Sequence, residues 1–147
     1  LQRSFPEIGG SCQWSAFTLL ADTAGYRERL KREYHKYPAL PPVFTFIDNQ
    51  APGKVRKLTA LWVNGEYMLQ WHEPKYKSEM DRAVQYVVYR FTSNEKIDLD
   101  PLNIVSIVCD NFYRLPYKDG ETEYRYVVTA LDRLHNESAP MMSLVKL

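Results

Sequence analysis

Carboxylates are the side chains of this sequence best suited to acid–base chemistry. Several lie in its second half: Asp98, Asp100, Asp110, Asp119, Glu121, Glu123 and Asp132. Hydrolysis of a glycosidic bond needs two carboxyl groups that converge in a cleft, about 5–10 Å apart. These residues instead stand beside Asn, Gly and Pro, as residues of turns do. We therefore interpret them as turn residues rather than as a catalytic pair.

Histidines and cysteines do not form a metal-binding pattern. His35, His72 and His135 are isolated, and none has a second histidine or cysteine at ligand spacing. Cys12 and Cys109 are the two cysteines of the chain, either as free thiols or as one long-range disulfide. We expect no metal site and no cofactor.

Aromatic residues offer a second kind of chemistry, since their rings can stack on sugar faces. The chain holds 11 Tyr and 3 Trp. Trp62, Tyr76 and Tyr117 are candidate carbohydrate-binding residues on exposed strands or loops, although buried tyrosines would give the same composition. Trp71 shares a strand face with Leu69, which favours a core position between two sheets over a sugar platform.

The elements that must position these residues are mainly strands. Asn-Gly at residues 64–65 and Asp-Gly at residues 119–120 are tight-turn signals, because such turns need positive φ. Short intervals between strands suggest a β-sandwich. The expected strands cover residues 58–63, 66–72, 83–91, 104–110 with an extension towards 113, 124–131 and 138–145.

Two strands carry more specific predictions. In residues 83–91, Tyr86 and Val88 are predicted to face the core. The opposite face is also apolar, so something must cover it, and the helical segment described next is one candidate. Tyr124 starts its strand after a polar turn, which is typical of the tyrosine whose hydroxyl bonds to an upstream backbone group in Greek-key sandwiches.

The front of the sequence has helical periodicity over residues 13–37, interrupted at Gly25. Asp22 or Thr23 could cap the second helix, whose body is expected at residues 26–36. Prolines at positions 38, 41, 42 and 52 predict an extended connection. The expected organisation is a helical segment at 1–43, a Pro-rich linker at 44–52 and a sandwich at 53–147.

Net charge, the length of the apolar runs and the first residue of the sequence limit the kinds of protein that this chain can be. The chain has 19 basic and 18 acidic residues, a net charge of +1. Nucleic-acid and anionic-membrane binders usually show a basic excess, so we expect neither partner. No apolar run approaches the ~20 residues of a membrane span. Because the sequence starts at Leu1 rather than Met, we expect a processed or cut segment whose targeting peptide is already gone.

The strand region resembles a fibronectin type III domain over residues 51–147. The resemblance lies in a Trp before a Pro at residues 69–74, a YVVYR run at 86–90, a YRYVVTALD run at 124–132 and an NESAP run at 136–140. It implies a fibronectin type III/immunoglobulin-like β-sandwich preceded by a helical segment, which is our expected fold class.

Residues 10–16 and 30–42 resemble the end of a catalytic (β/α)₈ barrel, with the run YHKYPAL at 34–40 as the best match. The family is a bacterial glycosyl-hydrolase-like family related to family ten, common in Bacteroidetes. The resemblance implies a secreted, periplasmic or cell-surface glycoside hydrolase as the whole protein. It places no catalytic carboxylate on any position of this chain, because barrel active sites draw on strands that are absent here.

We therefore expect a non-catalytic accessory sandwich whose partner is its own barrel in a polysaccharide-processing enzyme. A carbohydrate-binding module and a protein-interaction module remain alternatives. A barrel helix without its barrel keeps an apolar stripe. We expect residues 12–37 to be helical and to fold onto the sandwich or onto a second copy, as a homodimer.

Overall fold

The computed structural model describes residues 15–147, which form parts of two compact units, Leu1–Lys36 and Tyr37–Leu147. The units divide at residue 36, whereas the sequence suggested a boundary at residue 43. In the described part of the chain, no helix is long and apolar enough to cross a bilayer.

The first unit is helical but broken. Its elements are α1 (Ala16–Leu20), a 3₁₀ turn at Thr23–Gly25, α2 (Tyr26–Arg29) and a π-helical turn at Leu30–Tyr34. The break is a run of positive φ angles at Asp22, Ala24 and Gly25. Gly25, rather than the expected Asp22 or Thr23, occupies the N-cap position of α2. The Asp22 carboxylate still accepts a 2.7 Å hydrogen bond from the Arg27 backbone N–H in the first turn of that helix. The helices are therefore shorter than the predicted stretch, and Cys12 and Trp14 lie outside the described residues.

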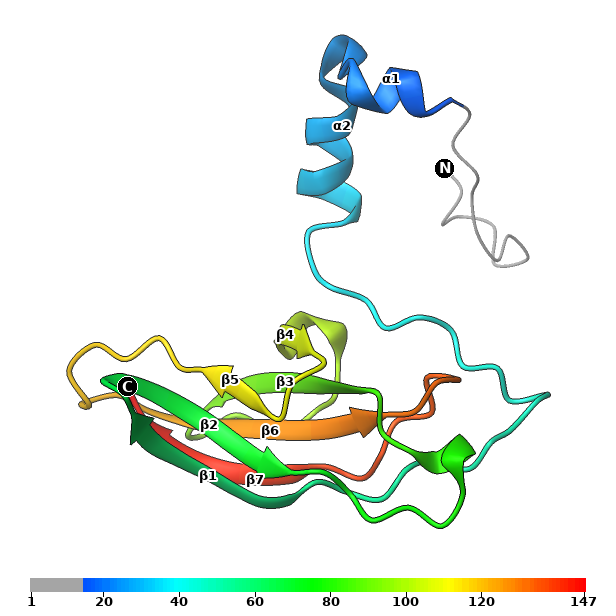
Figure 1. Cartoon of the computed structure of the whole chain (residues 1–147). Helices are drawn as coiled ribbons and strands as arrows, with labels where there is room; N and C mark the ends of the chain where they lie inside the picture. The colour runs from blue at the N-terminus through cyan, green and yellow to red at the C-terminus, as the bar shows by residue number, and fades with distance from the viewer. Residues whose placement is uncertain (1–14) are drawn as a thin grey trace. The chain divides into compact units, whose positions relative to one another are not determined.

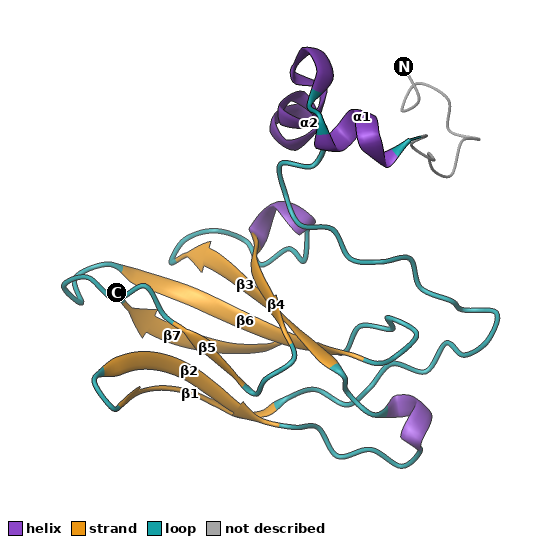
Figure 2. Ribbon diagram, turned by 45° about the horizontal axis from the view of Figure 1, so that its top comes forward, coloured by secondary structure: helices purple, strands orange, loops and turns teal. Residues whose placement is uncertain are grey.

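The second unit is a sandwich of two antiparallel sheets (Figures 1 and 2). One sheet has the order β1-β2-β5 and the other has the order β4-β3-β6-β7. This three-plus-four arrangement confirms the expected mainly β, fibronectin type III/immunoglobulin-like fold. The strands are β1 (Arg56–Val63), β2 (Glu66–His72), β3 (Gln85–Thr92), β4 (Ile104–Val108), β5 (Phe112–Arg114), β6 (Glu123–Leu131) and β7 (Met141–Lys146).

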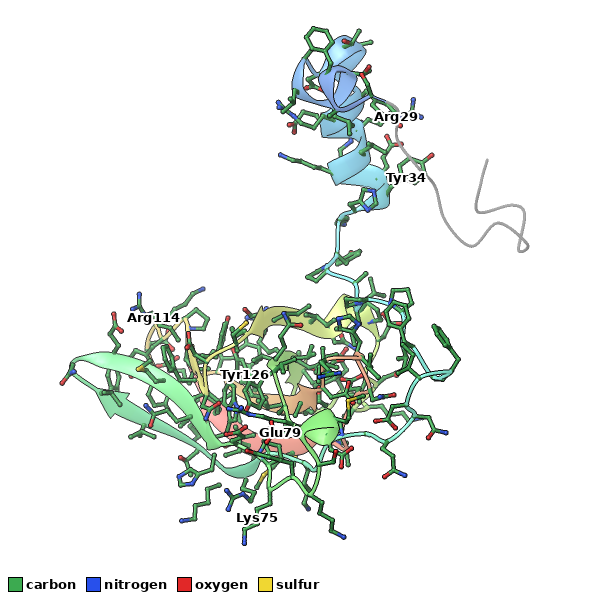
Figure 3. The ribbon with its side chains drawn as sticks, turned by 45° about the vertical axis from the view of Figure 1, so that its right-hand side comes forward. Arg29, Tyr34, Lys75, Glu79, Arg114 and Tyr126 are labelled. Carbon is green, nitrogen blue, oxygen red and sulfur yellow. The ribbon has the colours of Figure 1, made fainter. Side chains whose placement is uncertain are left out.

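The core between the sheets follows the predicted strand faces. Trp71 is 3% exposed, and its ring meets Tyr86 edge-on at a centroid distance of 5.3 Å. Leu69 and Val88 are fully buried in the same cluster. Figure 3 shows Tyr126 inside this layer, whereas Lys75 lies at the surface. The interpretation of Trp71 as a core residue is thus confirmed.

A second apolar cluster covers the outer face of the four-stranded sheet. It contains Tyr89 and Phe91 of β3, and partly buried Leu40, Ile97 and Leu99 pack against it. The cover observed here is the β3–β4 connection and the segment before the sandwich.

One expected strand proved to be two. The sequence suggested a single strand from residue 104 towards residue 113, but the chain bends at residues 109–111. β4 pairs with β3, and β5 pairs with β2 in the other sheet. The turn-forming residues Asp110 and Asn111 lie at this crossing. The apolar stretches on the two sides of this bend therefore supply one strand to each sheet.

The expected tyrosine corner is also absent from the described residues. Tyr124 is half-buried, and its hydroxyl makes no hydrogen bond to an upstream backbone group there. The Arg90 guanidinium instead lies 5.2 Å from the centre of the Tyr124 ring. A cation–π contact replaces the expected hydrogen bond.

Candidate functional site

Three aromatic rings meet at the β1–β2 end of the sandwich, and we call Trp62, Tyr67 and Tyr117 the aromatic cluster. Trp62 stacks on Tyr67 with ring centres 5.1 Å apart. Tyr117 meets Trp62 edge-on at 4.9 Å and Tyr67 at 5.5 Å. Trp62 is 55% exposed and Tyr117 is 42% exposed. The three rings therefore pack against one another, while Trp62 and Tyr117 keep part of their surface exposed to solvent.

A tight hairpin positions two of these rings. Asn64 and Gly65 have φ angles of 49° and 82°, as the predicted turn requires. The turn places Trp62 directly opposite Tyr67 in the register of β1 and β2. Neighbours across an antiparallel pair are close enough to interact. The stack is thus a direct consequence of the Asn-Gly turn.

The third ring comes from the β5–β6 loop and depends on a glycine. Gly120 has a φ of 81°, and a Cβ atom built there would lie 3.0 Å from the Tyr117 hydroxyl. A side chain at position 120 would therefore meet both backbone strain and the ring. The expected Asp-Gly turn thus leaves room for Tyr117.

The structure separates the third candidate from the other two. Among the described residues, Tyr76 makes no ring contact with the aromatic cluster, and the Arg82 guanidinium lies 5.8 Å from its ring centre. Tyr67, which was not among the candidate residues, is the third ring of the cluster instead. The signal for Tyr67 was available, because a two-residue turn at 64–65 pairs position 62 with position 67.

A second surface feature was missed from sequence. A depression of about 410 Å³ is lined by Lys57, Thr59, Gln70, Trp71, His72, Asn111 and Phe112. A register shift in β1 and a φ of 52° at Lys57 mark a bulge beside it. Bulges redirect side chains and often lie near functional sites. Amide, ammonium and imidazole groups around one phenyl ring could bind a polar ligand, but nothing in the β1 sequence announces the bulge.

Several candidate carboxylates serve as turn acceptors. Asp100 accepts a hydrogen bond from the Leu102 backbone N–H at 2.8 Å, and Asp119 accepts one from Glu121 at 2.9 Å. The described residues contain no group of three His, Cys, Asp or Glu side chains that could hold a metal ion. Cys109 is a free, exposed thiol.

One part-buried carboxylate network lies away from both surface features. Glu137 accepts hydrogen bonds from the Tyr89 hydroxyl at 2.8 Å and from the Thr129 hydroxyl at 2.6 Å. Burial and the Glu137 carboxylate raise the pKa of Tyr89. A phenol held in its neutral form next to a carboxylate acts as a hydrogen-bond donor, which suits a structural role.

Comparisons with known proteins add a sequence relative and a fold likeness. No known family profile matches the chain. It is 26% identical over 138 residues, 94% of its length, to glycosyl hydrolase YngK of Bacillus subtilis strain 168, but it spans only 27% of that relative. The FN3tt mut structure covers 65% of the chain with a TM-score of 0.49 at 15% identity, matching 94% of that protein. A structure of titin kinase with its flanking domains covers 66% with a TM-score of 0.47 at 20% identity, matching 18% of that chain.

Proposed function

We propose that this chain is the non-catalytic C-terminal accessory sandwich of a secreted glycoside hydrolase that acts on polysaccharide. The observation that carries the proposal is the alignment with a glycosyl hydrolase over 94% of this chain but 27% of the relative. A sandwich that aligns with a minor part of a longer hydrolase is best explained as one of its domains. A bacterial family related to family ten, of the type found in Bacteroidetes, remains our proposal for that hydrolase.

The roles of the described carboxylates support the absence of chemistry in this domain. Asp100, Asp119 and Asp132 are occupied by backbone N–H groups of their own turns. The Glu137 carboxylate is engaged by two hydroxyl groups. Catalytic carboxyl groups need a cleft between them, and these four instead hold local structure.

Deletion in the longer protein tests the accessory role. Removing residues 37–147 should leave kcat on a small aryl glycoside almost unchanged at low temperature, because the reacting groups lie elsewhere. It should shorten the half-life of activity at raised temperature, because a packed neighbour stabilises the domain that it contacts. A truncated enzyme that stays folded by circular dichroism but loses kcat would show that this segment takes part in catalysis.

The aromatic cluster favours a second candidate function, binding of the polysaccharide itself. Trp62 has one face stacked on Tyr67, and the residue remains 55% exposed. An exposed indole can stack on the C–H face of a pyranose ring. Rings that already support each other lose little conformational entropy when a sugar binds. This gives a binding site without any catalytic group.

Affinity electrophoresis in polysaccharide gels tests this second function. If the cluster binds sugar, the chain should be retarded and Trp62→Ala should abolish the retardation. Tyr76→Ala is the matched control. Tyr76 is as exposed as Tyr117 of the cluster, but it lies outside the cluster. Retardation lost with Lys57→Ala but kept with Trp62→Ala would assign binding to the polar depression. No retardation in any gel would remove sugar binding from the proposal.

A further inference from the structure

The segment leading into the sandwich carries four exposed apolar side chains, which we call the connector ridge. Val43, Phe44, Phe46 and Ile47 are 44%, 42%, 83% and 57% exposed. Single exposed apolar residues are common, but a contiguous group of large ones marks an interaction site. The prolines of this segment predicted an extended linker and gave no hint of such a surface.

The connector ridge is held in a defined shape by hydrogen bonds to the sandwich. The Phe44 backbone N–H donates to the Leu134 carbonyl at 3.3 Å, and the Ile47 N–H donates to the Phe44 carbonyl at 3.0 Å. The Asn136 side-chain amide donates to the Asp48 carbonyl at 3.2 Å. A segment fixed at both ends of the ridge does not behave as a loose tether.

Burial nearby strengthens this attachment. Asn136 is 6% exposed, and its amide also donates to the Asp132 carboxylate at 2.9 Å. The Phe44 ring lies 6.4 Å from the His135 ring. A buried polar network therefore holds the backbone down while the apolar side chains face outward. Exposing fixed apolar groups costs free energy unless a partner covers them.

We propose that the connector ridge is the surface on which the sandwich docks against the domain that precedes it in the longer hydrolase. This inference rests on the proposed function. The relative is far longer than the aligned segment, since this chain covers only 27% of it. The ridge lies in the N-terminal part of the sandwich unit, so any preceding domain is tethered close to it.

Because the two domains are joined in one chain, a small apolar surface is enough for them to dock. A short connection gives the joined domains an effective concentration in the millimolar range. Interfaces between domains of one chain are often as small as about 600 Å². The ridge would supply the apolar centre of such an interface, and a second copy of the chain would lack the benefit of the tether.

Hydroxyl-radical footprinting of side chains tests this docking. In the longer protein, Phe46 and Ile47 should be oxidised several-fold more slowly than in the 147-residue chain. Leu144 on β7 is the internal control, because its 57% exposure matches that of Ile47. Its oxidation rate should be the same in both proteins. Equal rates for Phe46 in both proteins would overturn the proposal.

Other occupants give different patterns, and each would overturn the proposal. Protection of Phe46 in the 147-residue chain that grows with protein concentration would indicate a second copy. Protection there that is independent of concentration would indicate a cover within the chain itself. Footprinting does not depend on activity, so a longer protein without glycosidase activity would refute the proposed function while leaving this test valid.

A variant in the connector ridge provides a second test of the docking. Phe46→Ser should fold normally, because the side chain is 83% exposed. In the longer protein it should speed oxidation of Ile47 and proteolytic cleavage within residues 37–52. Leu144→Ser should change neither rate. A Phe46→Ser protein that keeps the slow oxidation of Ile47 would contradict docking through this ridge.

Discussion

Three tyrosines of the sandwich unit are buried, Tyr86 and Tyr126 between the sheets and Tyr89 on the outer face of the four-stranded sheet, and burial raises the pKa of each hydroxyl. The pKa of Tyr86 and of Tyr126 rises to about 12, with burial as the main cause. Burial also raises the pKa of Tyr89, and its bond to the Glu137 carboxylate adds to the effect. The Tyr126 hydroxyl has no hydrogen-bond partner in the described structure. The folded chain thus holds phenol protons that the unfolded chain releases near pH 10.

These shifts predict a loss of stability in alkali. A raised pKa in the folded state contributes stability that is complete below pH 10 and lost as the pH rises through the folded value. Each such tyrosine should lower the free energy of unfolding by about 1.4 kcal/mol per pH unit between pH 10 and 12. Urea titrations across this range measure the slope.

A matched pair of variants isolates the contribution of one buried phenol to this slope. Tyr86→Phe removes one buried hydroxyl and should flatten the slope by one tyrosine's share. Tyr76→Phe removes an exposed hydroxyl and is the control for the loss of a phenol group. Equal slopes in Tyr86→Phe and the unmodified chain would show that Tyr86 titrates normally in the folded state.

Residue-level prediction from sequence succeeded where alternation decides the outcome. Alternation placed Leu69 and Trp71 inside, and both are buried. It could not show that Trp62 and Tyr117 meet, because they lie in separate loops and strands whose approach depends on tertiary packing. The positive φ of Lys57 was also beyond prediction, since the sequence there holds neither Gly nor Asn.

At the scale of elements, the β6–β7 turn is held by several hydrogen bonds to one carboxylate. Asp132 is fully buried, and its carboxylate accepts hydrogen bonds from the backbone N–H groups of Leu134 and Asn136. The Asn136 side chain joins this carboxylate to the Asp48 carbonyl. One buried carboxylate therefore organises the turn and fastens the connector ridge.

Asp132→Ala should destabilise the sandwich by about 2–3 kcal/mol, because several buried N–H donors lose a charged acceptor. Chemical denaturation measures the loss, and hydrogen exchange should also show faster exchange at the Phe44 amide. Asp119→Ala is the control, since Asp119 is exposed and accepts one hydrogen bond from its own turn. The expectation fails if the two variants lose similar stability.

Strand bounds were predicted well beside the Asn-Gly turn at residues 64–65. They were predicted wrongly for residues 104–113, which form one strand in each sheet. The Asn-Gly turn predicted where β1 ends and β2 begins. β1 starts two residues earlier than expected, and β2 has the predicted bounds. Residues 104–113 look like one strand because every apolar residue suits either layer. Only the pairing with β3 or β2 divides them, and pairing is a tertiary property. The helical interruption predicted at Gly25 is observed, with a φ of 69° there, but positive φ at Asp22 and Ala24 lengthens the break beyond what the sequence indicated.

At the scale of the whole molecule, the chain joins a helical unit to a sandwich with its own core. Phe17 and Leu20 of α1 are each 76% exposed, and no residue of the described helices is buried. The sandwich, in contrast, buries a full layer of side chains between its sheets. That the front segment is the end of a catalytic barrel stays a prediction. How residues 15–36 pack, on the sandwich or on a second copy, stays a prediction.

Hydrolysis of coloured aryl glycosides by the 147-residue chain, measured beside the longer protein at equal molar concentration, tests the accessory role most directly. We expect release of the aryl group by the longer protein alone, because we propose that the reacting carboxyl groups lie outside this chain. Turnover by the 147-residue chain that persists after repurification would contradict this role and would make this segment an enzyme in its own right.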